Sequence, residues 1–135
     1  MTRYLLDANA LSDCIYRRRG VDVKAREARL RGATLGTAIP AAAEVLAGTE
    51  FSSTRDRNLP IVERGLRTFR LWPFDMASAR EYSRIYAELR QLGRPTPTID
   101  MFIAAVARSI GNCRIVSCDS DFSDIPGIRV ENLAH

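Results

Sequence analysis

The sequence predicts an α/β protein built on a mainly parallel sheet, and three observations carry this prediction. Helix-like segments alternate with short apolar segments along the chain, a pattern typical of βαβ units. No repeat, low-complexity tract or linker interrupts the alternation. The chain has 135 residues, of which 46% are hydrophobic and 27% charged, as in ordinary globular domains. We therefore expect a single domain over residues 1–135.

The first third of the chain contains the strand around which we expect the protein to be organised. Residues 4–6 are apolar and lead directly into Asp7, and residues 8–16 look helical. A basic loop over residues 17–20 follows, which is either a solvated turn or a phosphate contact. Residues 21–30 can form a second short helix.

The middle third repeats the alternation. Residues 34–39 are apolar enough for a strand, and Pro40 fits the first turn of a helix that we expect to end at Gly48. That helix is apolar nearly all round, so we expect it to be buried. Within residues 53–69 apolar side chains recur at helical spacings with arginines between them, which indicates a helix with one basic face.

The last third begins with a predicted strand over residues 70–74 and a long amphipathic helix over residues 76–92, whose aromatic stripe we interpret as packing. After a stiff connector, residues 99–107 should form a buried helix with Thr98 or Thr96 as its N-cap. Two short strands follow, over residues 114–117 and 128–130.

Composition narrows the chemistry and the location. No apolar run approaches the roughly 20 residues that cross a bilayer and no signal-peptide pattern is present, so we expect a cytoplasmic protein. Three cysteines without paired spacing argue against a disulfide framework or structural zinc. Of the 20 basic residues only Lys24 is a lysine, and the net charge is +4. Such a surface attracts nucleic acid, although ordinary solvated arginines explain it equally well.

Four carboxylates occur where a parallel sheet would bring them together. Asp7 and Asp119 follow predicted strands, Asp100 opens a helix, and Glu44 lies one turn into another. Each aspartate also has a structural explanation, because Asp7 can cap a helix, Asp100 can favour a helix dipole, and Asp119 and Asp121 can form a turn. Glu44 lies among alanines, where a buried carboxylate would need a partner or a metal.

Carboxylates that share one crevice cannot all ionise unless cations offset their repulsion. Ligands that are all oxygen atoms favour Mg²⁺ or Mn²⁺, and the absence of clustered histidine or cysteine argues against zinc. A site of this kind suits hydrolysis of phosphodiester bonds.

Four segments in order resemble the PIN domain family, most closely the toxins of VapC type. They are residues 4–12, Ala43 with Glu44, residues 99–105, and residues 117–122 followed by 126–132. The resemblance implies a three-layer α/β/α sandwich and a Mg²⁺- or Mn²⁺-dependent endoribonuclease. It implies that Asp7, Glu44, Asp100 and Asp119 are the catalytic, metal-binding acidic residues, with Asp121 as a further metal ligand. Asn9 and Ser117 match nearby polar positions that orient ligands. Cys118 departs from the family pattern, which has a polar residue there.

The resemblance also implies partners. Similar toxins act on RNA, form homodimers and are neutralised by a cognate antitoxin, which inserts its C-terminal segment across the active-site cleft and itself binds DNA. Two other functions stay open. One is an RNA-binding or partner-binding PIN-like module without turnover. The other is a phosphatase with Asp7 as nucleophile, although that chemistry needs a proton donor two residues on, where this chain has Asn9.

Overall fold

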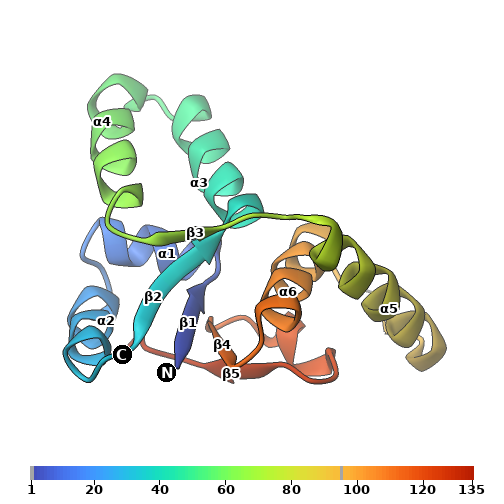
Figure 1. Ribbon diagram of the computed structural model, residues 1–135. Coiled ribbons are helices and arrows are strands. Elements are labelled where there is room, and N and C mark those ends of the chain that lie inside the picture. Colours follow the sequence, from blue (N-terminus) through green and yellow to red (C-terminus); the bar gives the residue numbers. More distant parts are fainter. Residues whose placement is uncertain (1, 95) are drawn as a thin grey trace.

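A central sheet of five parallel strands organises the protein. The computed structural model describes residues 2–94 and 96–135, and its strand order is β3-β2-β1-β4-β5 (Figure 1). The strands are β1 (Arg3–Leu6), β2 (Thr34–Ala38), β3 (Arg70–Trp72), β4 (Cys113–Val116) and β5 (Arg129–Glu131). Every strand pair runs parallel, with Leu6 in register with Thr37 on one side and Val116 on the other. The carboxyl ends of β1, β2 and β4 therefore meet at one edge.

Helices cover both faces of this sheet, as the predicted three-layer architecture requires (Figure 1). They are α1 (Ala8–Ile15), α2 (Val21–Leu30), α3 (Ile39–Phe51), α4 (Arg55–Leu66), α5 (Met76–Leu92) and α6 (Thr98–Ile110), with a 3₁₀ turn η1 (Ser120–Asp124) before β5. Helices α5 and α6 pack on one face, and α1, α2 and α4 pack on the other. The α/β prediction is confirmed.

The two faces have separate hydrophobic cores because successive strand residues point to opposite sides. In β1, Leu5 faces the core that includes Ile85 of α5 and Ile103 of α6. Its neighbours Tyr4 and Leu6 face the other core, with Leu11 and Val62. A strand buried on both faces is expected to read as a continuous apolar run, and β1 does.

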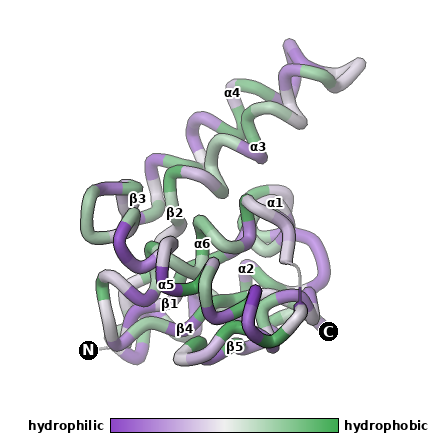
Figure 2. The backbone as a smooth tube through the Cα atoms, turned by 90° about the vertical axis from the view of Figure 1, so that its right-hand side faces the viewer, coloured by the Kyte–Doolittle hydropathy of each residue, from purple (hydrophilic) through white to green (hydrophobic). Residues whose placement is uncertain are grey.

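Helices α3 and α4 form an antiparallel pair that projects from the sheet, an arm that Figure 2 shows extending away from the rest of the chain. The predicted burial of α3 is wrong: only Ala41, Ala42 and Thr49 are buried, whereas Ala43 and Ala47 are exposed. The predicted end at Gly48 is also wrong, since the helix continues to Phe51. An apolar composition cannot show whether neighbouring elements are available to cover a helix.

Most remaining boundaries agree with the predictions to within two residues, and α5 agrees at both ends. Gly93 ends α5 in the left-handed conformation (φ 65°), which glycine adopts at little cost. The N-cap predicted for α6 is wrong. Pro97 occupies the N-cap position and no side chain caps the helix, while Thr98 is already its first residue.

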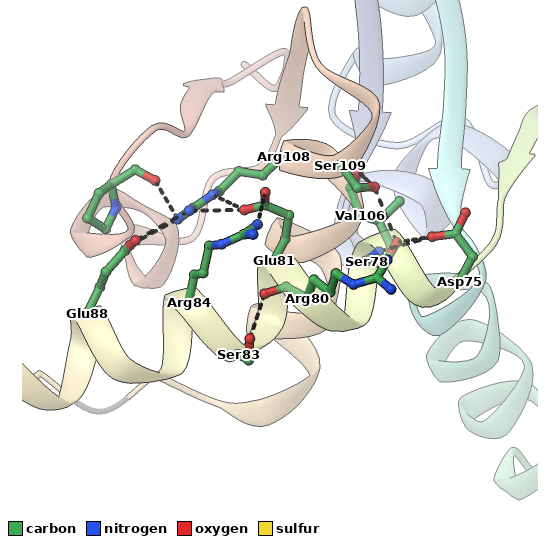
Figure 3. A network of polar contacts seen from close by, with 11 residues as sticks. Asp75, Ser78, Arg80, Glu81, Ser83, Arg84, Glu88, Val106, Arg108 and Ser109 are labelled. Carbon is green, nitrogen blue, oxygen red and sulfur yellow. Dashed lines mark hydrogen bonds and ion pairs between the residues drawn. The ribbon is translucent and has the colours of Figure 1, made fainter.

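A polar network joins α5 to α6 (Figure 3). The Arg108 guanidinium of α6 lies 3.0 Å from a Glu81 carboxylate oxygen and 2.9 Å from a Glu88 oxygen, both on α5. It also donates to the Pro126 carbonyl in the segment before β5. Only 17% of the Arg108 side chain is exposed, so this contact is shielded from water more than most ion pairs of the protein. It connects two helices with the β4–β5 connection.

No helix among the described residues is both long and apolar enough to cross a membrane.

Candidate active site

The five predicted acidic residues lie around one pocket at the carboxyl edge of the sheet. The pocket has a volume of about 870 Å³. Its lining includes Asp7, Glu44, Asp100, Asp119 and Asp121, together with Asn9. Parallel strand ends produce this convergence: Asp7 directly follows β1, and its backbone N–H donates to the Val116 carbonyl at the end of β4 (3.1 Å). Asp119 and Asp121 lie in the connection that follows β4 and also line the pocket.

Asp7 caps helix α1 and also lines the pocket. It is 5% exposed, and its carboxylate accepts a hydrogen bond from the Ala10 N–H (2.8 Å), which begins α1. Burial raises the pKa of Asp7 above its usual value, Asp119 adds to this rise, and hydrogen bonds from Ser117 and Ala10 oppose it. The capping explanation is therefore right, and it does not exclude a role in the pocket.

Ser117 lies behind the pocket rather than in its lining. Its side chain is buried and its Oγ accepts a hydrogen bond from the Asp119 N–H (2.9 Å). The hydroxyl is hydrogen-bonded to Asp7 as well. Ser117 thus contacts both aspartates that follow β1 and β4.

Glu44 differs from the prediction in its burial. The helix that carries it stands on the projecting arm, so Glu44 is exposed and not enclosed by alanines. It nevertheless lines the pocket, and its pKa is raised by partial desolvation and by the charge of Asp7. Burial therefore does not require a partner for Glu44. What makes Glu44 a candidate metal ligand is its position in the same pocket as the other carboxylates.

Asp100, Asp119 and Asp121 form the tightest group. One carboxylate oxygen from each lies within 4.8 Å of the others. Asp119 caps the η1 turn by accepting from the Asp121 N–H (2.9 Å), which holds both residues in place. Burial and repulsion from Asp119, Asp121, Glu44 and Asp7 raise the pKa of Asp100 to about 6.

The donor set fits a hard divalent cation. All the acidic residues of the pocket offer carboxylate oxygens, and no lysine, histidine or cysteine is among the described residues that line it. The pKa values of Asp7, Glu44 and Asp100 are raised first by burial and then by repulsion from neighbouring carboxylates. A bound cation would offset that repulsion, and oxygen ligands select Mg²⁺ or Mn²⁺ over softer metals.

The pocket lining also contains residues that the sequence analysis did not predict as site residues. They include Ser12, Tyr16 and Arg18 at α1 and beyond its end, and Ser52, Arg57 and Asn58 at the α3–α4 junction. Two sequence signals pointed toward them: the basic loop of residues 17–20 and the basic face of residues 53–69. Neither signal showed that these segments face the same pocket.

Cys118 lies beside the pocket but does not line it. Cys118 is exposed. Its sulfur accepts a hydrogen bond from the Arg19 guanidinium (3.6 Å). Cys14 and Cys113, in contrast, are half-buried. The departure from the family pattern at this position therefore leaves the carboxylate arrangement intact.

Comparison with known proteins identifies relatives of similar length. The tRNA(fMet)-specific endonuclease VapC of Shigella flexneri is 29% identical and Ribonuclease VapC2 of Haemophilus influenzae is 29% identical, each over 98% of both chains. Among solved structures, VapBC from Salmonella typhimurium bound to DNA has a TM-score of 0.86 at 26% identity, covering 99% of this chain and 100% of that one. VapBC2 from Rickettsia felis bound to a promoter DNA fragment has a TM-score of 0.89 at 21% identity, covering 97% and 98%.

The family assignment rests on a broader match than any single relative. The family model described as PIN domain matches residues 4–128, nearly the whole chain. That range begins in β1, ends just before β5 and includes every acidic residue of the pocket. The chain belongs to the PIN domain family.

Proposed function

We propose that this protein is a metal-dependent endoribonuclease and the toxin of a toxin–antitoxin pair, with residues 1–135 as one domain. The observation that carries the proposal is the convergence of five carboxylates in one pocket, three of them with oxygens within 4.8 Å of one another. The names of the relatives support it, since they are called endonuclease or ribonuclease VapC.

In this proposal Asp7, Glu44, Asp100 and Asp119 hold Mg²⁺ or Mn²⁺, with Asp121 as a further ligand. When bound, the ion would activate water for attack on phosphorus and offset the charge that develops on the phosphate. The protein itself keeps the ligands in place through the Asp119 cap on η1 and the Ser117 hydroxyl between Asp7 and Asp119. Asn9, exposed in the pocket lining, would contact the substrate or a ligand from outside.

The partners follow from the same comparison. The solved neighbours include VapBC assemblies bound to DNA. We therefore propose a cognate antitoxin as a protein partner, with DNA contacted through the antitoxin, and a homodimer as the form of the toxin. RNA is the proposed substrate.

The decisive test is cleavage of RNA by the purified protein with Mn²⁺, with Mg²⁺, and in EDTA. We expect cleavage that requires the metal and is lost in Asp100→Asn, because that variant removes one of the three carboxylates whose oxygens lie within 4.8 Å of one another. Glu63→Gln is the matched control, since Glu63 is exposed on α4 and outside the pocket. Equal cleavage by wild type and Asp100→Asn would refute the proposal.

The same preparation separates the two other functions. A binding module without turnover would hold RNA in EDTA, take up no Mn²⁺ in calorimetry and leave the RNA intact. An aspartyl phosphatase would release phosphate from a monoester and form a covalent adduct at Asp7.

A further inference from the structure

The pocket continues as a groove beyond the carboxylates, between α1 and α3. Ser12 of α1 and Tyr16, the C-cap residue of α1, are four residues apart and line the pocket. Glu44 and Gly48 of α3 and Ser52, its C-cap residue, line it at two successive four-residue steps. Side chains four residues apart share one face of a helix. On both helices the pocket lining extends over about eight residues, which is on the order of 12 Å along a helix.

A metal ion needs only the carboxylate end of this groove. Its total volume of about 870 Å³ is that of a site for a drug-sized ligand. Gly48 contributes to the width, since no atom lies within 4 Å of where its Cβ would be. The groove therefore has space for a substrate group beside the metal ligands.

The lining also contains positive charge. Arg57 lines the pocket from the first turn of α4 and is exposed, and no ion pair of Arg57 is found among the residues that the structure describes. Arg18, the other arginine of the lining, donates to Ser12 (2.8 Å) and lies 3.5 Å from the Asp13 carboxylate. The charge of Arg57 is therefore the one available to an anion from outside, and arginine matches phosphate oxygens well.

An aromatic ring lines the same pocket. Part of the Tyr16 ring packs against the core formed by α1, α2 and α4, and the Arg18 guanidinium lies 4.9 Å from the ring centroid. Stacked aromatic and guanidinium groups are the surfaces on which unpaired bases of RNA are held. Asn58 beside Arg57 is oriented by its hydrogen bond to Thr54 (2.7 Å), and its amide retains an oxygen that can accept from a base edge.

We infer that the part of the groove lined by Tyr16 and Arg57 is a nucleotide-binding site for single-stranded RNA. Arg57 binds a phosphate of the bound strand, and the exposed part of Tyr16, with Arg18 beside it, contacts a base. The inference rests on the proposed ribonuclease function. It adds the substrate contacts, which the carboxylates cannot supply because they repel phosphate.

Binding without turnover tests the inference. The probe is a fluorescein-labelled single-stranded RNA of about 12 nucleotides, followed by anisotropy in EDTA. We expect Arg57→Ala to weaken binding about tenfold, the loss of one charge-assisted phosphate contact. Arg64→Ala is the matched control, seven residues along the same helix, exposed and outside the lining. We expect it to change binding less than about twofold.

Two further measurements separate a contact from a structural effect. The slope of log K against log salt should be shallower in Arg57→Ala by about 0.7, the value for one phosphate on a single strand. Tyr16→Leu should weaken binding about fivefold or more through lost stacking, whereas Tyr16→Phe retains the ring and should bind as wild type does. Mn²⁺ affinity should be unchanged in all four variants, since none removes a carboxylate.

The outcomes distinguish this inference from the proposed function. If wild type cleaves RNA but Arg57→Ala binds as Arg64→Ala does, the groove site is refuted and the nuclease stands. If no RNA is cleaved but the binding losses occur as expected, the nucleotide site stands and the nuclease fails. The inference is also refuted if the wild-type protein binds no RNA. It is refuted likewise if the wild-type protein binds an RNA duplex as tightly as the single strand.

Discussion

The Asp7 carboxylate accepts a 2.8 Å hydrogen bond from the Ala10 backbone N–H while the same side chain lines the acidic pocket. One residue thus begins α1 and contributes charge to the candidate site. The two roles can be separated, because asparagine caps helices as well as aspartate does but has no charge.

We expect Asp7→Asn and Asp7→Ala to lose Mn²⁺ affinity to a similar degree in calorimetry. In urea unfolding with EDTA, Asp7→Ala should be about 1 kcal/mol less stable than Asp7→Asn, the usual contribution of an N-cap. The comparison between the two variants cancels the effect of removing the buried charge. Mn²⁺ binding by Asp7→Asn at wild-type affinity would mean that Asp7 is a cap and nothing more.

The stability of the metal-free protein should fall as pH rises from about 4 to about 6. The pKa of Asp100 is about 6 in the folded protein against 3.8 for the unperturbed group, so in this window the folded state binds more protons than the unfolded state. The free energy of unfolding then decreases with pH. Urea unfolding in EDTA at several pH values measures the slope. Asp100→Asn should flatten it, and an unchanged slope in that variant would assign the effect to other groups.

Divalent metal should reverse this dependence. Metal binding requires ionised carboxylates, so Mn²⁺ should raise the melting temperature more at pH 7 than at pH 5. At a free Mn²⁺ concentration of 100 times Kd the stabilisation is about 2.7 kcal/mol. Differential scanning calorimetry with Mn²⁺ and with EDTA at both pH values is the measurement. An equal shift at both would indicate binding outside the carboxylate pocket.

Arg108 should stabilise the α5–α6 pair far more than Arg84 does. Arg108→Met leaves Glu81 and Glu88 without their shared partner in a place where the arginine is only 17% exposed, which should cost about 2 kcal/mol. The Arg84 side chain is 58% exposed and pairs with Glu81 from the same helix, so Arg84→Met should cost less than about 0.5 kcal/mol. Urea unfolding of both variants checks the difference, and equal losses would contradict it.

Two glycines should respond to alanine in opposite directions. A Cβ on Gly36 in β2 would lie 2.5 Å from the Arg70 carbonyl oxygen and 2.6 Å from the Trp72 ring, so Gly36→Ala should destabilise by about 2 kcal/mol or more. Gly48 has open space around it in the interior of α3, where alanine should add about 0.5–1 kcal/mol. Thermal unfolding measures both. A stable Gly36→Ala protein would show that β2 and β3 can separate without cost.

The sequence predicted the sheet and the ends of its strands well because those features depend on short-range patterns. A strand covered on both faces contains a continuous apolar run, as β1 does from Tyr4 to Leu6, and Gly93 marks the end of α5 through its conformational freedom. Asp7 and Asp119 each follow a predicted strand. This position was enough to place both residues at one edge of the sheet, because parallel strands end on the same side.

The failures concern features that depend on distant neighbours. Whether α3 is buried depends on what packs against it, and only Ala41, Ala42 and Thr49 are buried. The exposure of Glu44 follows from the same fact. The presence of Tyr16 and Arg57 in one pocket could not be predicted, because it depends on how the end of α1 and the start of α4 are placed by the fold.

The position of β1 between β2 and β4 has a consequence for how the protein emerges from the ribosome. Arg3 pairs with Cys113, almost at the other end of the chain. One edge of the first strand therefore stays unpaired through most of translation, and Asp7 has neither Ser117 nor Asp119 beside it until then. The nascent chain cannot assemble the acidic pocket before its last quarter is synthesised. During most of translation, therefore, the growing chain has no complete pocket.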